Sequence, residues 1–165
     1  MINIKVKKLH ENAVIPEYAH ATDSGFDLYT STETYLKPYS TGIAKTGLAF
    51  DIPYGWGIMV RNRSGITVKG CPVSPFIDAD QDKGFYLSSE SVVVNLDVKM
   101  GTVDCDYKGE LGIMVYNNSD KYIAIPRGTK LAQGVLEKVY QASFTEVEEL
   151  SDSARGTGGF GSTGI

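Results

Sequence analysis

The chain has 165 residues, the length of a single domain, and 42% of them are hydrophobic, which is enough for a core. Its formal net charge of -4 excludes a general nucleic-acid binder, because neutralising many phosphates needs a basic face. The sequence shows no apolar signal segment and no run of membrane-spanning length. We therefore expect a cytoplasmic protein that binds neither nucleic acid nor membrane directly.

Short runs of strand-forming residues recur along the whole chain, separated by Gly, Pro and Asn turn signals. The composition includes 18 Gly, 10 Tyr and 6 Phe, which favours strands joined by turns. No helical period is sustained over three turns. The predicted strands are residues 2–6, 26–30, 47–52, 57–60, 92–98, 111–116, 122–125 and 131–140. Many short strands in one domain predict an all-β fold, a jelly roll or a related distorted β-barrel.

Asp27 interrupts the predicted strand 26–30, because it stands between the apolar residues Phe26 and Leu28. Such a carboxylate either alternates toward solvent or faces a ligand, and strand periodicity favours the solvent interpretation. The next polar group follows in VRNRSGITVKG, where Arg63 and Ser64 precede Gly65. These residues could form an anion-binding turn that uses positive φ at the glycine, although ordinary turn chemistry explains Ser-Gly equally well.

Residues 71–91 depart from the strand rhythm and are long for a loop, so we expect them to be functional. Asp78, Asp80 and Asp82 with Gly84 approximate a calcium loop, but the glycine falls one position late and Ser89 occupies position twelve. A solvated acidic loop is the favoured interpretation. Cys71 and Cys105 lack metal-site spacing, so we expect them to be packing residues in a reducing compartment.

The stretch GTVDCDYKGEL carries two carboxylates, Asp104 and Asp106, which share a face if the backbone is extended. Tyr107 would lie opposite, and Gly109 would close a hairpin. A carboxylate that polarises a water is the use we predict for this pair. Further along, Gln133 stands among apolar neighbours, where its amide must find partners in the fold or in a ligand.

The chain ends in ARGTGGFGSTGI, whose Gly156, Gly158 and Gly161 match the G-x-G-x-x-G spacing of dinucleotide-binding proteins. Only four residues follow, so no helix can supply the phosphate-binding amides, and that interpretation is rejected. A flexible linker remains open on composition. Arg155 and Phe160 instead favour an arm that closes over an aromatic, anionic ligand. We predict a domain over residues 1–150 and a flexible Gly-rich arm over residues 151–165.

Together, DSGFDL, RSG, GTVDCDYKGEL, the K-L-A-Q run and RGTGGFGSTG resemble, in order, the five motifs of the trimeric dUTPases. This resemblance covers nearly the whole chain and implies a jelly-roll homotrimer with its active sites at subunit interfaces. It also implies Mg²⁺-dependent hydrolysis of dUTP to dUMP and pyrophosphate, by water attack on the α-phosphorus. That reaction limits uracil in DNA and supplies dUMP.

The resemblance also implies roles for individual residues, carried over motif by motif. Catalytic roles fall to the general base Asp104, to Arg63, which supports that base or the phosphates, and to Gln133 near the α-phosphate. Asp27 would anchor Mg²⁺ through water. Tyr107 would stack under the deoxyribose and exclude a 2'-hydroxyl, and uracil would be read by the main chain from Gly101 to Leu111. The remaining substrate-binding residues are Ser64, Gly65, Lys108, Gly109, Arg155, Phe160 (over the uracil), Gly161, Ser162 and Thr163.

Two features depart from the family pattern. Asn62 stands where members often carry proline, which we expect to affect the stiffness of the adjoining loop. The stretch between Arg63 and Asp104 is also longer, by on the order of twenty residues that a compact loop would not need. Similar insertions occur in phage-encoded dUTPases that also bind a repressor of a mobile genetic island. We hypothesise that residues 71–91 contact such a repressor, which would place the protein in a host-cell cytoplasm.

Two alternatives remain open. A dCTP deaminase would share the fold and the nucleotide site, although the DCDY stretch and the complete glycine-rich tail fit the pyrophosphatase better. A non-catalytic regulator that binds nucleotide as a switch is the second alternative, and it is disfavoured because all the chemical residues are present.

Overall fold

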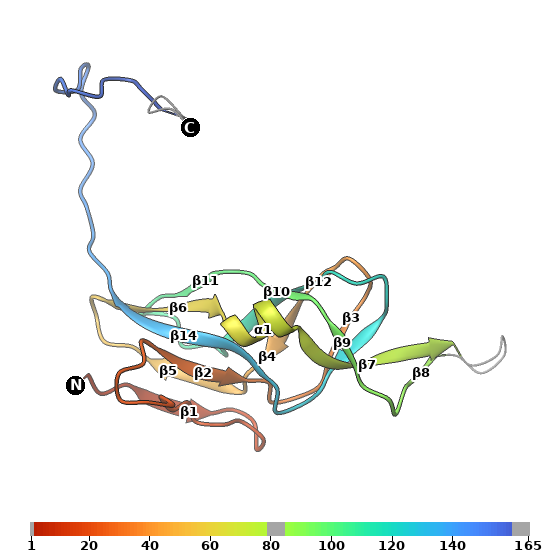
Figure 1. The fold of residues 1–165 in the computed structure, drawn as a ribbon. Helices are drawn as coiled ribbons and strands as arrows, with labels where there is room; N and C mark the ends of the chain where they lie inside the picture. Colours follow the sequence, from red (N-terminus) through yellow and green to blue (C-terminus); the bar gives the residue numbers. More distant parts are fainter. Residues whose placement is uncertain (1, 79–84, 160–165) are drawn as a thin grey trace.

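The computed structural model describes residues 2–78 and 85–159, and it confirms the all-β prediction. Figure 1 shows the strands gathered in one body, from which the β7–β8 hairpin projects at one end. The C-terminal segment leaves the body at the other end. The strands are β1 (Lys5–Lys8), β2 (Gly25–Tyr29), β3 (Thr34–Leu36), β4 (Thr41–Lys45), β5 (Leu48–Asp51), β6 (Trp56–Asn62), β7 (Cys71–Asp78), β8 (Phe85–Leu87), β9 (Val92–Val94), β10 (Leu96–Val98), β11 (Gly101–Val103), β12 (Gly112–Asn117), β13 (Ile123–Ile125) and β14 (Lys130–Lys138). One short helix, α1 (Ser64–Lys69), lies between β6 and β7 in the part of the chain that is described.

The strands form antiparallel sheets whose order mixes distant parts of the sequence. One sheet has the order β11-β6-β14-β2, and another has the order β10-β12-β4. The insert contributes to a further sheet, β3-β13-β7-β8, while β1 pairs with β5. Most strand partners are remote in sequence, which is the pairing expected of a jelly roll rather than of a simple meander.

All these sheets share one apolar core. Leu28 on β2 and Ile58 on β6 are fully buried in it, as are Ile113 on β12 and Ile123 on β13. Alternation along the strands explains this arrangement, since β2 has every second side chain buried. The core therefore fixes the register of β2 and β14, which carry Asp27 and Gln133, and of β6, which leads into Arg63.

Several local predictions are wrong. Residues 92–98 do not form one strand, because the chain breaks at Asn95 into β9 and β10. Strands β3, β4 and β11 were not predicted, since β3 and β11 have only three residues each and β4 buries only Ala44. The predicted turn at Ser64 and Gly65 is instead the first turn of α1, and Gly65 does not have the positive φ that such a turn would use.

The predicted long loop at 71–91 is also mostly strand. Its β7 pairs with β8, β9 and β13, and so extends the sheet of the main body. Cys71 and Val73 at the start of β7 are fully buried. Burial raises the pKa of the Cys71 thiol to about 11, which suits a packing residue. The predicted acidic loop, with Asp80, Asp82 and Gly84, lies outside the described residues, and Asp78 ends β7.

Past β14 the described residues, 139–159, belong to no strand or helix. Figure 1 shows this segment running away from the body. It carries large apolar side chains that are almost fully exposed, including Phe144 at 94% and Leu150 at 87%. Among the described residues, no helix is long and apolar enough to span a membrane.

Candidate active site

The first candidate site is a cavity of about 350 Å³ beside β11, which we call the β11 hollow. It is lined by β11, by the turn that follows it and by the start of β12, with Gly101, Asp104, Tyr107 and Leu111 among the lining residues. Because β11 pairs with β6 whereas β12 pairs with β4 and β10, residues 101–111 connect two sheets. The predicted hairpin is therefore a crossing turn without a ladder of its own.

Asp104 starts that turn, and the Tyr107 amide donates to its carbonyl oxygen over 3.1 Å. The backbone is thus not extended between Asp104 and Asp106, so the prediction that the two carboxylates share a face loses its basis. Asp104 and Tyr107 line the β11 hollow together, and both are exposed, whereas Asp106 is not among its lining residues. Of the two carboxylates, only Asp104 is placed to act on a ligand there.

The Tyr107 ring is held at the hollow by its own turn. Its hydroxyl donates to the Glu110 carbonyl oxygen over 2.9 Å. A Cβ atom on Gly109 would lie 2.5 Å from the Tyr107 hydroxyl oxygen, so any side chain at that position would displace the ring. Gly109 therefore acts by leaving space for Tyr107.

Lys108, predicted to bind substrate, lies outside the lining of the β11 hollow. Its ammonium group donates to the Asp51 carboxylate and to the Cys105 carbonyl oxygen, each over 2.8 Å. The hydrogen bond from Lys108 lowers the pKa of Asp51. In the single chain, the Lys108 side chain ties the turn to β5.

A second cavity, also of about 350 Å³, lies beside the start of α1, and we call it the α1 hollow. Its polar lining comes from the segment before β2, which includes His20 and Asp23, and from β2, the β6–α1 junction and β14, which bring Asp27, Arg63, Ser64, Gly65 and Gln133 together. Asp27 and Gln133 are register partners on paired antiparallel strands, so their side chains point to the same face. The sequence motifs thus converge here because the sheet order brings β2 next to β14.

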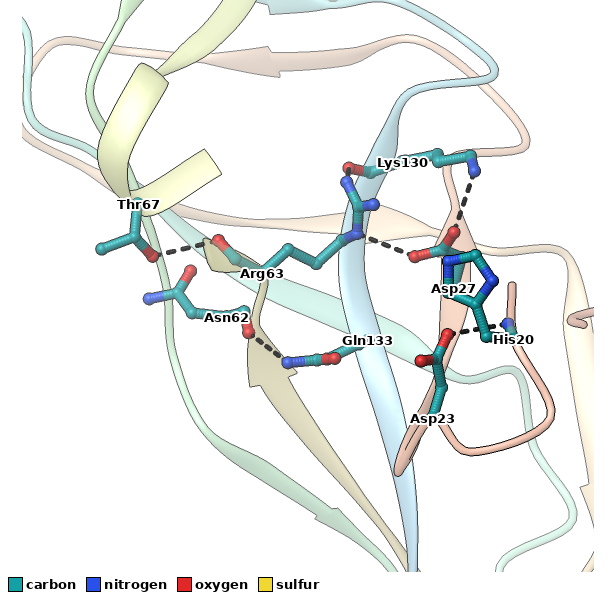
Figure 2. A network of polar contacts seen from close by, with 8 residues as sticks. All are labelled: His20, Asp23, Asp27, Asn62, Arg63, Thr67, Lys130 and Gln133. Atoms are coloured by element: carbon teal, nitrogen blue, oxygen red, sulfur yellow. Dashed lines mark hydrogen bonds and ion pairs between the residues drawn. The ribbon is translucent and has the colours of Figure 1, made fainter. Parts of the chain in front are cut away.

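The carboxylate of Asp27 is the centre of a polar network in the α1 hollow (Figure 2). Arg63 Nε lies 2.8 Å from Asp27 Oδ1, and Lys130 Nζ lies 2.9 Å from Asp27 Oδ2. Arg63 also donates to the Lys130 carbonyl oxygen over 3.2 Å. The hydrogen bond to Asp27 raises the pKa of Lys130. The solvent interpretation that strand periodicity favoured for Asp27 is wrong, since its side chain is only 16% exposed, whereas the resemblance placed it beside the ligand.

Within one chain the Arg63 guanidinium faces Asp27, and its support of Asp104 or of the phosphates stays a prediction. Lys130 was missed by sequence reasoning, although it opens the K-L-A-Q run and stands three residues before Gln133. The amide of Gln133 is half-buried and donates to the Asn62 carbonyl oxygen over 2.8 Å.

A divalent cation would find few direct ligands in the α1 hollow. No group of three His, Cys, Asp or Glu side chains gathers anywhere in the described ranges 2–78 and 85–159. Each oxygen of Asp27 already accepts from a cationic side chain. A contact through water is the geometry that fits this carboxylate, because Mg²⁺ commonly keeps several of its waters.

The two hollows share no lining residue and lie at opposite edges of one sheet. Asp104 follows β11 at one edge, while Asp27 lies on β2 at the other, with β6 and β14 between them. Three strand spacings separate these edges by roughly 14 Å. No side chain in a single copy can bring Asp104 within hydrogen-bonding reach of a group bound beside Asp27.

The arm contributes to neither hollow in the described part of the chain. Arg155 Nε donates to the Gly158 carbonyl oxygen over 2.8 Å, and the side chain is exposed. Phe160, Gly161, Ser162 and Thr163 lie outside the described residues.

Comparison with known proteins supplies the deciding observation. A profile of the dUTPase family matches residues 11–92 and 85–164. The deoxyuridine 5'-triphosphate nucleotidohydrolase of Helicobacter pylori (strain Shi470) is 39% identical over 164 residues, which is 99% of this chain and 98% of the relative. The enzyme of the same name from Picosynechococcus sp. is 37% identical over 163 residues, 99% of each chain. The chain belongs to the dUTPase family.

Solved dUTPase structures agree with this assignment. The dUTPase of Staphylococcus bacteriophage 80alpha with dUpNHpp superimposes with a TM-score of 0.78 at 26% identity, covering 100% of both chains. The dUTPase of phage phi11 of S. aureus, described for its species-specific insert, gives a TM-score of 0.70 at 25% identity and covers 92% of this chain and all of its own. The jelly-roll prediction is thereby confirmed, and the enzyme class is dUTP diphosphatase.

Proposed function

We propose that this dUTPase hydrolyses dUTP to dUMP and pyrophosphate, with Asp104 as the general base for a water that attacks the α-phosphorus. The observation that carries the proposal is the pair of complementary hollows. One offers main-chain groups, an aromatic ring and a carboxylate, and the other offers cationic side chains, a hydroxyl and an amide. A nucleoside suits the first, and a triphosphate suits the second.

The nucleoside end of dUTP would occupy the β11 hollow. Its main-chain groups from Gly101 to Leu111 can read the uracil edge, and Tyr107 would lie against the deoxyribose. The Tyr107 hydroxyl donates to Glu110 and Gly109 leaves room for the ring, so a ring held there would leave no space for a 2'-hydroxyl. Discrimination against UTP would then come from a clash. Asp104 is exposed at the same hollow, where it can accept a proton from an attacking water.

The phosphates would occupy the α1 hollow. Ser64 and Gly65 would hold the inner phosphates, Gln133 would reach the α-phosphate, and Arg63 would add positive charge. Bound Mg²⁺ neutralises part of the triphosphate charge. Asp27 would contact a water of that ion, with Arg63 and Lys130 holding the carboxylate in place. A phi11 dUTPase variant described with a structural Mg(II) ion supports a role for magnesium in this family.

A complete active site would form between copies of the chain in a homotrimer. The β11 hollow of one copy would face the α1 hollow of the next, which removes the separation of roughly 14 Å within one copy. The exposed apolar side chains of Tyr140, Phe144 and Leu150 support an extended segment that packs on another copy. The arm after it would carry Arg155, Phe160, Ser162 and Thr163 to that site and close over the nucleotide.

The test is hydrolysis of dUTP, dCTP and UTP by the purified protein with and without Mg²⁺, followed by assays of pyrophosphate and ammonia. We expect pyrophosphate from dUTP only, and a strong dependence on Mg²⁺. Ammonia released from dCTP would instead establish the deaminase alternative. Binding of dUTP without any turnover would establish the purely regulatory one.

We further propose that the insert at 71–91 contacts a repressor protein. Support comes from the β7–β8 hairpin, which projects from the body, and from the phage neighbours, described as controlling the transfer of virulence genes. Because Cys71 and Val73 are core residues, the test should replace only residues 77–86 with a short turn. We expect loss of repressor binding with normal dUTP hydrolysis and an intact trimer. Unchanged repressor binding in that variant would refute the proposal.

A further inference from the structure

Asn62 joins two sheets at the point where the chain enters the α1 hollow. It is the last residue of β6 and directly precedes Arg63. Its Nδ2 donates to Asp97 Oδ1 over 3.1 Å, and its Oδ1 accepts from the Val98 amide over 3.1 Å. Both partners belong to β10, which lies in a different sheet from β6. The side-chain amide therefore clamps the end of β6 at two points.

The main-chain carbonyl of the same residue holds a group of the candidate site. It accepts from Gln133 Nε2 over 2.8 Å, as Figure 2 shows. A primary amide has two N–H donors and one carbonyl acceptor, so this bond fixes which end of the Gln133 amide faces Asn62. The second N–H and the carbonyl oxygen of Gln133 remain free to serve a ligand in the hollow that this residue lines.

We infer that Asn62 is a positioning residue, which orients Gln133 toward the α-phosphate and holds the entry to Ser64. The inference rests on the proposed role of Gln133. A proline, which dUTPases often carry at this position, would stiffen the backbone by fixing φ. Asn62 constrains the same backbone by hydrogen bonds to β10. Loss of the clamp lets the Asn62 carbonyl move, and the Gln133 amide moves with it.

The experiment compares Asn62→Ala, Gln133→Ala and the double variant in steady-state dUTP hydrolysis. Asn62→Ala should lower kcat about tenfold with KM nearly unchanged, because a small misplacement of a group that acts in the transition state slows turnover. The double variant should be no slower than Gln133→Ala alone, since Asn62 acts on turnover only through the Gln133 amide. Multiplied losses in the double variant would overturn the inference.

Asn117→Ala is the matched control for stability. Asn117 is fully buried and its side chain donates to the carbonyl oxygens of Lys37 and Lys121, none of which lines the α1 hollow. We expect a lower melting temperature for this control with kcat unchanged. If Asn62→Ala behaved in the same way, Asn62 would be merely structural and the inference would fail.

Asp97 provides a second route to the same test if Asn62→Ala does not fold. Asp97→Asn keeps an acceptor for Asn62 Nδ2, whereas Asp97→Ala removes it. We expect a loss of kcat only in Asp97→Ala, and equal kcat in the two variants would contradict the clamp. Wild-type protein without dUTP turnover would overturn the proposed function, while an active wild type with a fully active Asn62→Ala would overturn only this inference.

Discussion

The two hollows are built in opposite ways. The β11 hollow is formed largely by one continuous segment, from Gly101 to Gly112, which brings its backbone along one side of the cavity. The α1 hollow assembles side chains from β2, β14 and the β6–α1 junction, held by ion pairs around Asp27. A base edge can be read by backbone groups that any sequence supplies, whereas phosphate charge requires particular side chains. Substitutions should therefore act on the two hollows differently.

The largest expected effect is at Asp104. Asp104→Asn should lower kcat by about two to four orders of magnitude, because it removes the proposed general base. dUTP binding, measured by calorimetry, should remain. Asp106→Asn is the matched control, since Asp106 is exposed but does not line the β11 hollow. Normal turnover in Asp104→Asn, or an equal loss in Asp106→Asn, would show that the base is wrongly assigned.

Removal of the arm should have the next largest effect. Truncation after Leu150 should reduce hydrolysis on the order of a hundredfold, because the groups that close over the nucleotide would be missing. The melting temperature should stay close to that of the full chain, since every described residue from 151 to 157 is exposed. Undiminished hydrolysis by the truncated protein would mean that the arm is only a linker.

The preference for dUTP over UTP tests nucleoside binding in the β11 hollow separately from the hydrolysis step. Gly109→Ala should displace the Tyr107 ring and reduce the preference for dUTP over UTP by about tenfold. Tyr107→Phe removes only the hydrogen bond to Glu110 and should keep most of that preference. The ratio of kcat/KM for dUTP and UTP measures both. Equal ratios in Gly109→Ala and wild type would show that the Tyr107 ring does not set the preference for dUTP.

The smallest expected effect concerns the α1 hollow. Lys130→Met removes one of the two cationic partners of Asp27 and should raise the KM for dUTP about threefold, with kcat nearly unchanged. Lys5→Met is the control, because the Lys5 side chain is 84% exposed, pairs with Asp51 and lines neither hollow. A KM that did not change in Lys130→Met would show that Arg63 alone holds Asp27.

The fold class and most of the catalytic motifs could be predicted from the sequence. Strand β2 shows the alternation that a shared core requires, and the polar residues Asp27 on β2 and Gln133 on β14 line the α1 hollow. Short elements such as β3 and β11 could not be predicted, because three residues carry no periodicity. In the insert, β7 was missed because its partner β13 lies far away in sequence, and β8 was missed because it has only three residues.

Side-chain partners were the least predictable part of the site. Nothing in the sequence indicated that Arg63 faces Asp27 rather than Asp104, since this depends on the order β11-β6-β14-β2. The clamp from Asn62 to β10 also joins residues that belong to different sheets. Motif spacing shows which groups matter, whereas the sheet order decides which of them can meet.

Mixing two inactive variants tests the central claim, that one copy supplies the β11 hollow and another the α1 hollow of each active site. Asp104→Ala and Gln133→Ala copies, co-expressed in equal amounts, should regain activity at about a quarter of their sites. In random assembly, about a quarter of sites combine the intact β11 hollow of a Gln133→Ala copy with the intact α1 hollow of an Asp104→Ala copy. Neither variant alone should show that activity. Mixed assemblies no more active than the separate variants would contradict the shared site.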